Sequence, residues 1–138
     1  MKTVLLDTNI IIYALNELDS ESKRAQEYIN QHIAVLAVAD QNINEALRVL
    51  THPKYKRSLD VKTALEAVNR IADECIHISP NIETRPKFYE LVREYNVSSN
   101  NIYDAYLVAT ALTNSIYEIV THNVKDFQIY TELAVLEF

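Results

Sequence analysis

Short apolar runs alternate along the chain with longer segments of helical periodicity. The apolar runs, which predict strands, are residues 3–6, 34–38, 76–78, 118–120 and 134–137. The helical patterns between them cover residues 10–15, 22–31, 41–50, 61–73, 85–95 and 101–113. Strands that alternate with helices of this length form βα units, which build a mainly parallel sheet. We therefore predict an α/β fold, specifically a three-layer α/β/α sandwich with a mainly parallel sheet of four or five strands.

The composition narrows the possible organisation and location. The 138 residues contain no repeat, low-complexity tract or linker, which predicts a single domain over residues 1–138. Asp7 ends the first apolar run after three residues, unlike a signal peptide, and no later segment reaches membrane-spanning length. We expect a cytoplasmic protein with no membrane partner.

The charge and the residue usage exclude some kinds of site. A formal net charge of −6 argues against charge-driven binding of duplex nucleic acid, which relies on a basic face. It does not exclude a nucleic-acid substrate at a site where a bound divalent metal supplies positive charge. The chain contains no glycine, so glycine-rich phosphate loops are excluded. Its single cysteine excludes an internal disulfide and a multi-cysteine zinc site.

The stretch VLLDTNII places Asp7 between two apolar runs. One interpretation is a helix N-cap, because an aspartate side chain accepts a hydrogen bond from a free backbone N–H of the first turn. Another is that Asp7 lies at the carboxyl end of a buried strand, where open α/β sheets bind their ligands. The stretch alone is compatible with both.

Asp104 and Glu45 each have a local structural interpretation and a functional one, as Asp7 does. Asp104 lies in the first turn of the helix at 101–113, where an acid complements the helix dipole, but the rest of that helix is apolar and is expected to be buried. Glu45 is either a surface residue paired with Arg48 or a residue that faces the same place as the other acids. All three acids follow the end of a strand or begin a helix, so we predict that they converge.

Converging carboxylates repel one another and are stable together only if protons or cations neutralise them. The chain offers these oxygen ligands without paired histidines or cysteines, which suits Mg²⁺ or Mn²⁺. A metal bound in this way clamps a phosphate and lowers the pKa of a bound water.

Four segments together resemble the PIN-domain family, and in particular the VapC-type toxin ribonucleases of bacteria and archaea. They are VLLDTNIIIYAL, NEALRVLTHP, NIYDAYLVATAL and EIVTHNVKDF, in the family's order along the whole chain. The resemblance implies cleavage of single-stranded or looped RNA by a metal-dependent endoribonuclease that uses Mg²⁺ or Mn²⁺. It also implies catalytic and metal-binding roles for Asp7, Glu45 and Asp104.

The family's fourth acidic position falls on Asn123 here. Its amide oxygen is able to ligate a metal but brings no charge, which weakens any second metal position. Asp126 is either a substitute for that acid or a turn residue that precedes a buried Phe127. The resemblance also implies that Thr8, Asn9 and Thr121 orient the carboxylates and bound waters. Possible substrate contacts are Arg48, His122 and Lys125.

In the mechanism that follows from the resemblance, Asp7 and Asp104 hold one ion and Glu45 directs a hydroxide at the scissile phosphate. The products would carry a 5′-phosphate and a 3′-hydroxyl. We expect the protein to be the toxin of a type II toxin–antitoxin pair and a homodimer. By analogy, the antitoxin would occupy a hydrophobic groove between the early helices.

Two other functions are considered. The first is a catalytically weakened PIN-like module that binds RNA or regulates, which Asn123 favours and the three retained acids oppose. The second is an unrelated doubly wound domain, either a phosphotransfer receiver or a hydrolase with Asp7 as nucleophile. The hydrolase needs another aspartate where Asn9 stands, and Lys125 is poorly placed to serve as the lysine that both require.

Overall fold

The computed structural model describes residues 2–138 and contains a parallel sheet in the order β3-β2-β1-β4-β5. Every neighbouring pair of these strands is parallel. The five strands are β1 (Val4–Leu6), β2 (Leu36–Ala39), β3 (Ile76–Ile78), β4 (Glu118–Thr121) and β5 (Ala134–Glu137). The predicted sheet is therefore confirmed.

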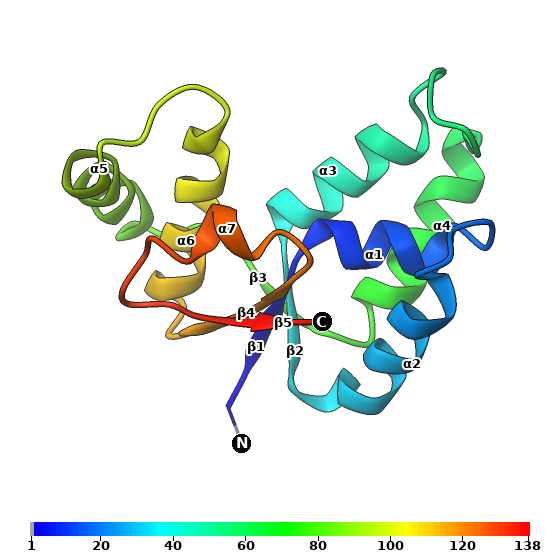
Figure 1. Cartoon of the computed structure of the whole chain (residues 1–138), viewed down its shortest axis with the longest axis horizontal. Helices are drawn as coiled ribbons and strands as arrows, with labels where there is room; N and C mark the ends of the chain where they lie inside the picture. Colours follow the sequence, from blue (N-terminus) through cyan, green and yellow to red (C-terminus); the bar gives the residue numbers. More distant parts are fainter. Residues whose placement is uncertain (1) are drawn as a thin grey trace.

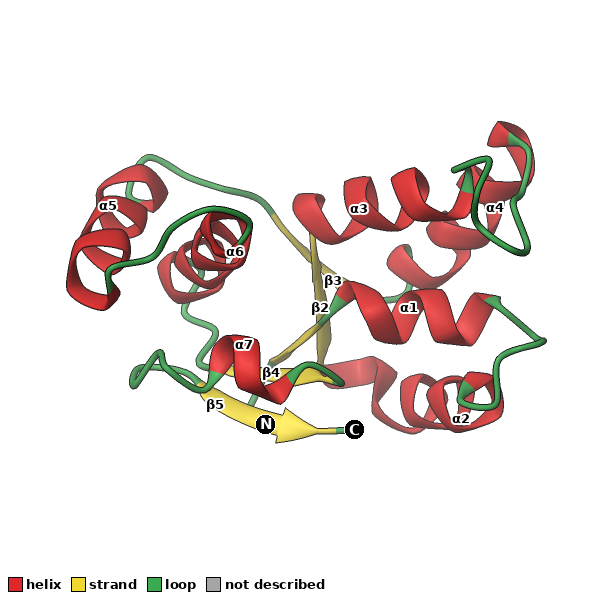
Figure 2. Ribbon diagram, turned by 45° about the horizontal axis from the view of Figure 1, so that its top comes forward, coloured by secondary structure: helices red, strands yellow, loops and turns green. Residues whose placement is uncertain are grey.

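Helices cover both faces of the sheet (Figure 1, Figure 2). One side carries α1 (Thr8–Leu15), α2 (Ser22–His32), α3 (Asp40–Leu50) and α4 (Val61–Ala72). The other side carries α5 (Thr84–Tyr95) and α6 (Asn101–Thr113), with the single turn α7 (Val124–Phe127) beside α6. This arrangement confirms the three-layer α/β/α sandwich. Between residues 2 and 138, every helix is too short or too polar to traverse a lipid bilayer.

The central strands β1, β2 and β4 are buried on both faces, which explains why they read as continuous apolar runs. The edge strands β3 and β5 are mostly exposed. In β1, Leu5 packs into the core under α5 and α6, whereas Val4 and Leu6 pack into the core under α1 to α4. The helix α6 is buried along most of its length, from Ala105 to Leu112, with only Tyr106 partly exposed. Its apolar sequence therefore has the role that we predicted for it.

Most predicted bounds lie within two residues of the structure, for example α1, which begins at Thr8 rather than at residue 10, but two differences matter for the sheet and the site. The strand predicted at residues 34–38 runs instead from Leu36 to Ala39, because Ile33–Val35 forms a turn of 3-10 helix after α2. The helix α7 was not predicted, since a single turn of four residues has no periodicity to detect. This turn carries Asp126, so the difference bears directly on the site.

The strand order creates a crevice at the carboxyl ends of β1 and β4. From β1 the chain proceeds to β2 and β3 on one side, and then returns to β4 and β5 on the other. The connections therefore diverge between β1 and β4, which is the position where open α/β sheets bind ligands. Asp7 directly follows β1, and Thr121 is the last residue of β4.

Candidate active site

Asp7 satisfies both sequence interpretations at once. It is the N-cap of α1, where its Oδ1 accepts a hydrogen bond from the backbone N–H of Thr8 at 2.8 Å. It also lies at the carboxyl end of β1, and its Oδ2 accepts a hydrogen bond from the Thr121 hydroxyl at 2.7 Å. Both carboxylate oxygens are therefore held in place by neighbouring groups.

Asp7 as a whole residue is 7 % exposed. Its burial raises its pKa from 3.8 to about 6, although the hydrogen bonds from Thr121 and Thr8 act in the opposite direction. The negative charges of Glu45 and Asp126 raise the pKa further. Ionised Asp7 is therefore an electrostatically strained group that a nearby cation would stabilise.

Glu45 is oriented by polar side chains from α1 and α3. Its Oε2 accepts a hydrogen bond from the Thr8 hydroxyl at 3.1 Å, and its Oε1 accepts one from Gln41 Nε2 at 2.9 Å. Asn42, which is fully buried, donates to the same Thr8 hydroxyl at 3.1 Å and accepts from the backbone N–H of Ala39 at 2.9 Å. Glu45 is thus tied to the end of β2 through two side chains.

Arg48 does not pair with Glu45. Glu45 is half-buried, and neither residue belongs to an ion pair within residues 2–138. The interpretation of Glu45 as a surface glutamate paired with Arg48 is therefore wrong.

Asp104 lies half-buried in the first turn of α6. Its burial raises its pKa from 3.8 to about 7, and the charges of Asp126, Asp7 and Glu45 raise it in the same direction. The pKa of Asp104 therefore responds to three other acids, which lie at the end of β1, in α3 and in α7.

These acids line one cavity of about 200 Å³, which we call the acid cleft. The side chains that surround it come from α1, α3, α6 and the segment after β4. They are Asp7, Thr8, Asn9, Ile12, Glu45, Arg48, Val49, Asp104, Asn123, Asp126 and Phe127. The three acids that the sequence singled out are thus brought to one place, together with Asn123.

The acids surround the acid cleft without contacting one another as a tight group. Within residues 2–138, one group of three acids has ligand oxygens within 4.8 Å of one another, and it lies elsewhere. That group consists of the exposed residues Glu90, Glu94 and Glu132, two of which pair with Lys87.

The donor set of the acid cleft fits a divalent cation that prefers oxygen ligands. Among the described residues that line it, four carboxylates and the Asn123 amide face a single cation, Arg48. Burial is the main cause of the raised pKa values of Asp7 and Asp104, and the neighbouring acids raise them further, so a bound cation would favour the ionised form of both groups. Oxygen donors without histidine or cysteine suit Mg²⁺ or Mn²⁺.

Asp126 lines the acid cleft, whereas the sequence left open whether it contributes to the site or is only a turn residue. It lies in the helix α7, lines the acid cleft, and is the nearby charge with the largest effect on the pKa of Asp104. Phe127, which follows it, is buried as expected. Because α7 is a single turn, nothing in the local pattern could show which way the Asp126 carboxylate faces.

The polar residues expected to orient the acids are connected through Thr121. Its hydroxyl accepts a hydrogen bond from the backbone N–H of Asn123 at 2.9 Å and a longer one from Asn9 Nδ2 at 3.4 Å. The same hydroxyl donates to Asp7. Thr121 therefore links both sides of the crevice between β1 and β4.

Two of the expected substrate contacts lie beside the acid cleft rather than in it. His122 and Lys125 line a neighbouring cavity of about 570 Å³ that shares Asn123 and Asp126 with the cleft. The His122 ring packs edge-on against Tyr13, with 5.5 Å between ring centroids. A role for either residue in substrate binding stays a prediction.

A third cavity, of about 680 Å³, adjoins the acid cleft on the side of α6, and we call it the outer cavity. Four of the residues that line the outer cavity also line the acid cleft. The other three belong to the first turn of α6 or directly precede that helix. The seven lining residues are Glu45, Arg48, Asp104, Asp126, Asn100, Asn101 and Tyr103.

Comparison with known proteins agrees with this architecture. The family model for the PIN domain matches residues 4–131. Comparison with curated proteins gives no significant match.

Solved structures of toxin–antitoxin proteins have the same fold. A chain of VapBC2 from Rickettsia felis, bound to a DNA fragment from its promoter, superposes with a TM-score of 0.75 at 15% identity, over 99% of this chain and 98% of that one. VapBC-1 from nontypeable Haemophilus influenzae gives 0.71 at 21% identity, over 98% and 97%. The Mycobacterium tuberculosis toxin VapC20, described as cleaving the sarcin-ricin loop, gives 0.64 at 15% identity, over 85% and 87%.

Proposed function

This chain belongs to the PIN domain family, and from that premise we propose that it is a metal-dependent endoribonuclease and the toxin of a type II toxin–antitoxin pair. The observation that carries the proposal is the convergence of Asp7, Glu45, Asp104 and Asp126 on one cleft at the carboxyl edge of the sheet. The similarity in fold to VapBC proteins, and to a toxin described as cleaving the sarcin-ricin loop, supports the same assignment.

We propose that Asp7, Glu45 and Asp104 are the catalytic and metal-binding residues, with Asn123 as a neutral ligand. Mg²⁺ or Mn²⁺ bound there would clamp a phosphate oxygen and lower the pKa of a water. Oxygen donors from three different elements would hold the ion, so the site depends on the packing of α1, α3 and α6 around the sheet.

The chain's own polar groups keep the acids in position for the reaction. Thr121 and the backbone of Thr8 fix both oxygens of Asp7, and Gln41 and the Thr8 hydroxyl fix both oxygens of Glu45. A carboxylate that is fixed in this way orients an attacking water without having to reorganise. Hydrolysis adds that water across the P–O3′ bond, which leaves a 5′-phosphate and a 3′-hydroxyl.

The alternative is a catalytically weakened PIN-like module that binds RNA or regulates, and Asn123 favours it because an amide brings no charge. Asp126 weighs against this alternative, because it supplies a fourth carboxylate to the same cleft. Titration with Mn²⁺ by calorimetry separates the two functions, since a weakened module would show no binding that depends on Asp7 and Asp104.

The experiment that tests the nuclease proposal is an RNA-cleavage assay on the purified protein. Single-stranded RNA should be cleaved with Mn²⁺ or Mg²⁺, spared in EDTA, and cleaved again after the metal is restored. The double variant Asp7→Asn and Asp104→Asn should be inactive while circular dichroism shows a retained fold. Undiminished cleavage by that variant would refute the proposed role of these acids.

We further propose a cognate antitoxin, a homodimeric state and a cytoplasmic location. A cavity of about 270 Å³ between α1, α2 and α4 supports an antitoxin site, because its lining includes Leu15, Ile29 and Ile71. Expression of the chain alone should slow growth, and co-expression of a small protein encoded beside it should restore growth. Light scattering on the purified chain tests the homodimer.

A further inference from the structure

The outer cavity begins where the acid cleft ends. The two cavities share Glu45, Arg48, Asp104 and Asp126, so a ligand in one lies beside the other. The residues that the outer cavity adds are exposed: Tyr103, with 66 % of its surface accessible, and the amides Asn100 and Asn101. An aromatic ring and two amides therefore stand next to four carboxylates.

Tyr103 is held at a fixed place relative to Glu45. Gln41 Nε2 donates to the backbone carbonyl of Tyr103 at 2.9 Å and to Glu45 Oε1 at 2.9 Å. One amide thus joins the first turn of α6 to α3. Within residues 2–138, the Tyr103 ring pairs with no other aromatic ring, and the residue is 66 % exposed, so solvent reaches it.

The charges around the two cavities show what kind of contact would bind RNA. Among the described residues that line either cavity, Arg48 is the only cation, and it faces four carboxylates. Attraction of phosphates by basic groups is therefore weak in this region. Stacking of a base on an aromatic ring and hydrogen bonds from amides need no positive charge, and they bind unpaired bases.

We infer that the outer cavity is a nucleobase subsite for single-stranded RNA. An unpaired base stacks on Tyr103, the amides of Asn100 and Asn101 hydrogen-bond to its edge, and Arg48 contacts the phosphate between this base and the scissile bond. The inference rests on the proposed nuclease function and adds to it the site that selects unpaired RNA. A paired base cannot occupy the subsite, because its face and edge are already engaged in the duplex.

The test uses a short single-stranded oligoribonucleotide in which 2-aminopurine replaces one base at a time. It is bound to the Asp7→Asn variant so that it stays intact. We expect quenching of the fluorescence at one position, and a Tyr103→Ala change should abolish it and weaken binding about tenfold. Tyr103→Phe should retain both, since the ring is kept. An abasic residue at that position should remove the difference between Tyr103 and Ala.

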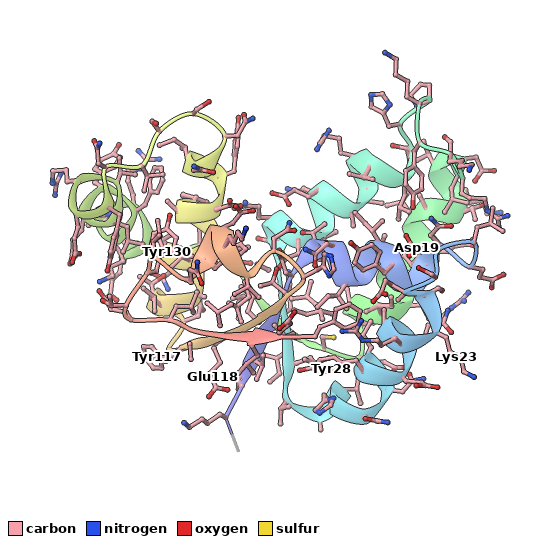
Figure 3. The ribbon with its side chains drawn as sticks, in the orientation of Figure 1. Asp19, Lys23, Tyr28, Tyr117, Glu118 and Tyr130 are labelled. Carbon is pink, nitrogen blue, oxygen red and sulfur yellow. The ribbon has the colours of Figure 1, made fainter. Side chains whose placement is uncertain are left out.

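Tyr117→Ala is the matched control. Tyr117 is similarly exposed, at 55 %, but Figure 3 shows it beside Glu118 at the start of β4, away from the first turn of α6. With Tyr117→Ala added, the Asp7→Asn variant should bind the oligoribonucleotide as tightly as without it. Duplex RNA of the same sequence should show no dependence on Tyr103.

Three results would overturn the subsite. The first is unchanged RNA binding when Tyr103→Ala is added to the Asp7→Asn variant, and the second is no binding of the oligoribonucleotide by the Asp7→Asn variant itself. The third is loss of a dimer by Tyr103→Ala without loss of RNA binding, which would make Tyr103 a protein-contact residue. Cleavage by the unmodified protein is measured separately. Cleavage without any effect of Tyr103 on binding refutes the subsite alone, whereas stacking without cleavage refutes the nuclease proposal.

Discussion

The hydroxyl of Thr121 donates a 2.7 Å hydrogen bond to Oδ2 of Asp7, although the two residues are 114 positions apart. Their strands, β1 and β4, are parallel neighbours in the sheet, with Leu6 paired to Val120 just before them. The same hydroxyl accepts a hydrogen bond from the backbone N–H of Asn123. Thr121 thus couples the acid at one strand end to the segment that follows the other.

Replacing Thr121 with valine should therefore weaken both the fold and the site. Valine keeps the volume but removes the hydroxyl from a fully buried position, which should cost about 1–3 kcal/mol in the free energy of unfolding. Metal-dependent cleavage should fall about 10–100-fold, as is typical when a group that orients a ligand is lost. Denaturant unfolding and a cleavage assay measure the two effects.

Thr121→Ser is the control for this change, because it keeps the hydroxyl. It should stay closer to the parent than valine in cleavage. Equal cleavage by the valine variant and the parent would show that the hydrogen bond to Asp7 does not matter for activity.

The buried acids predict a stability that falls as the pH rises. The folded-state pKa values of Asp7 and Asp104 are raised to about 6 and about 7, from 3.8 for an ordinary aspartate. The folded protein therefore holds these protons more tightly than the unfolded chain does. Their stabilising contribution is complete below the unfolded pKa and is lost as the pH rises through the folded values. For Asp7 the loss at about pH 8 is on the order of 3 kcal/mol.

This prediction is measured as the free energy of unfolding in EDTA between about pH 4 and about pH 8. The difference between the parent and Asp7→Asn reports the contribution of Asp7 together with its coupling to Asp104, because the other titrating groups are common to both proteins. The asparagine variant should gain in relative stability as the pH rises. A constant difference across this range would contradict the raised pKa.

Replacing Asn123 with aspartate should strengthen metal binding. The change adds a carboxylate to the acid cleft at a position that we propose as a metal ligand, so the affinity for Mn²⁺ should increase about tenfold. Without metal, the added repulsion should lower the free energy of unfolding. Calorimetric titration with Mn²⁺ measures the first effect, and denaturant unfolding in EDTA measures the second.

Gln128→Glu is the matched control for that substitution. Gln128 lines the neighbouring cavity but not the acid cleft, so glutamate there adds the same charge outside the proposed ligand set. An equal gain in affinity from both changes would attribute the effect to long-range charge rather than to ligation.

Ser115→Gly should stabilise the protein without affecting the site. The helix α6 ends in a pair of hydrogen bonds, from Ile116 N–H to the Ala111 carbonyl and from Ser115 N–H to the Leu112 carbonyl. These bonds require Ser115 to adopt a left-handed backbone with φ of 59°. Glycine has no Cβ to clash there, so the free energy of unfolding should rise by about 1 kcal/mol.

Denaturant unfolding measures this gain, and Ser115→Ala is the control because it retains the Cβ. Alanine should give no comparable increase. If glycine and alanine had the same effect, the strained backbone would not be its cause.

The sequence predicted some elements to the residue and others poorly, for reasons that differ from one element to the next. The predicted bounds of α6 match the structure, because its polar first turn and long apolar run are distinctive over a whole helix. The turn α7 could not be predicted from four residues, and with it the position of Asp126 was lost. Gln41 and Asn42 were also missed, since Gln41 bonds to Tyr103 and Asn42 to Thr8, which are 62 and 34 positions away, and a surface amide has the same local pattern.

By itself, the sequence determined the alternation of strands and helices, the order of the family's motifs and the identity of the three converging acids. These properties depend on residues close together in the chain, where periodicity and burial leave a readable pattern. Only the tertiary structure decided that Asp126 joins those acids, that Glu45 is bound by Gln41 and Thr8, and that Tyr103 lines the outer cavity beside the acid cleft. The order of the strands sets these distances, and the directions of single side chains follow from packing between elements that the sequence keeps far apart.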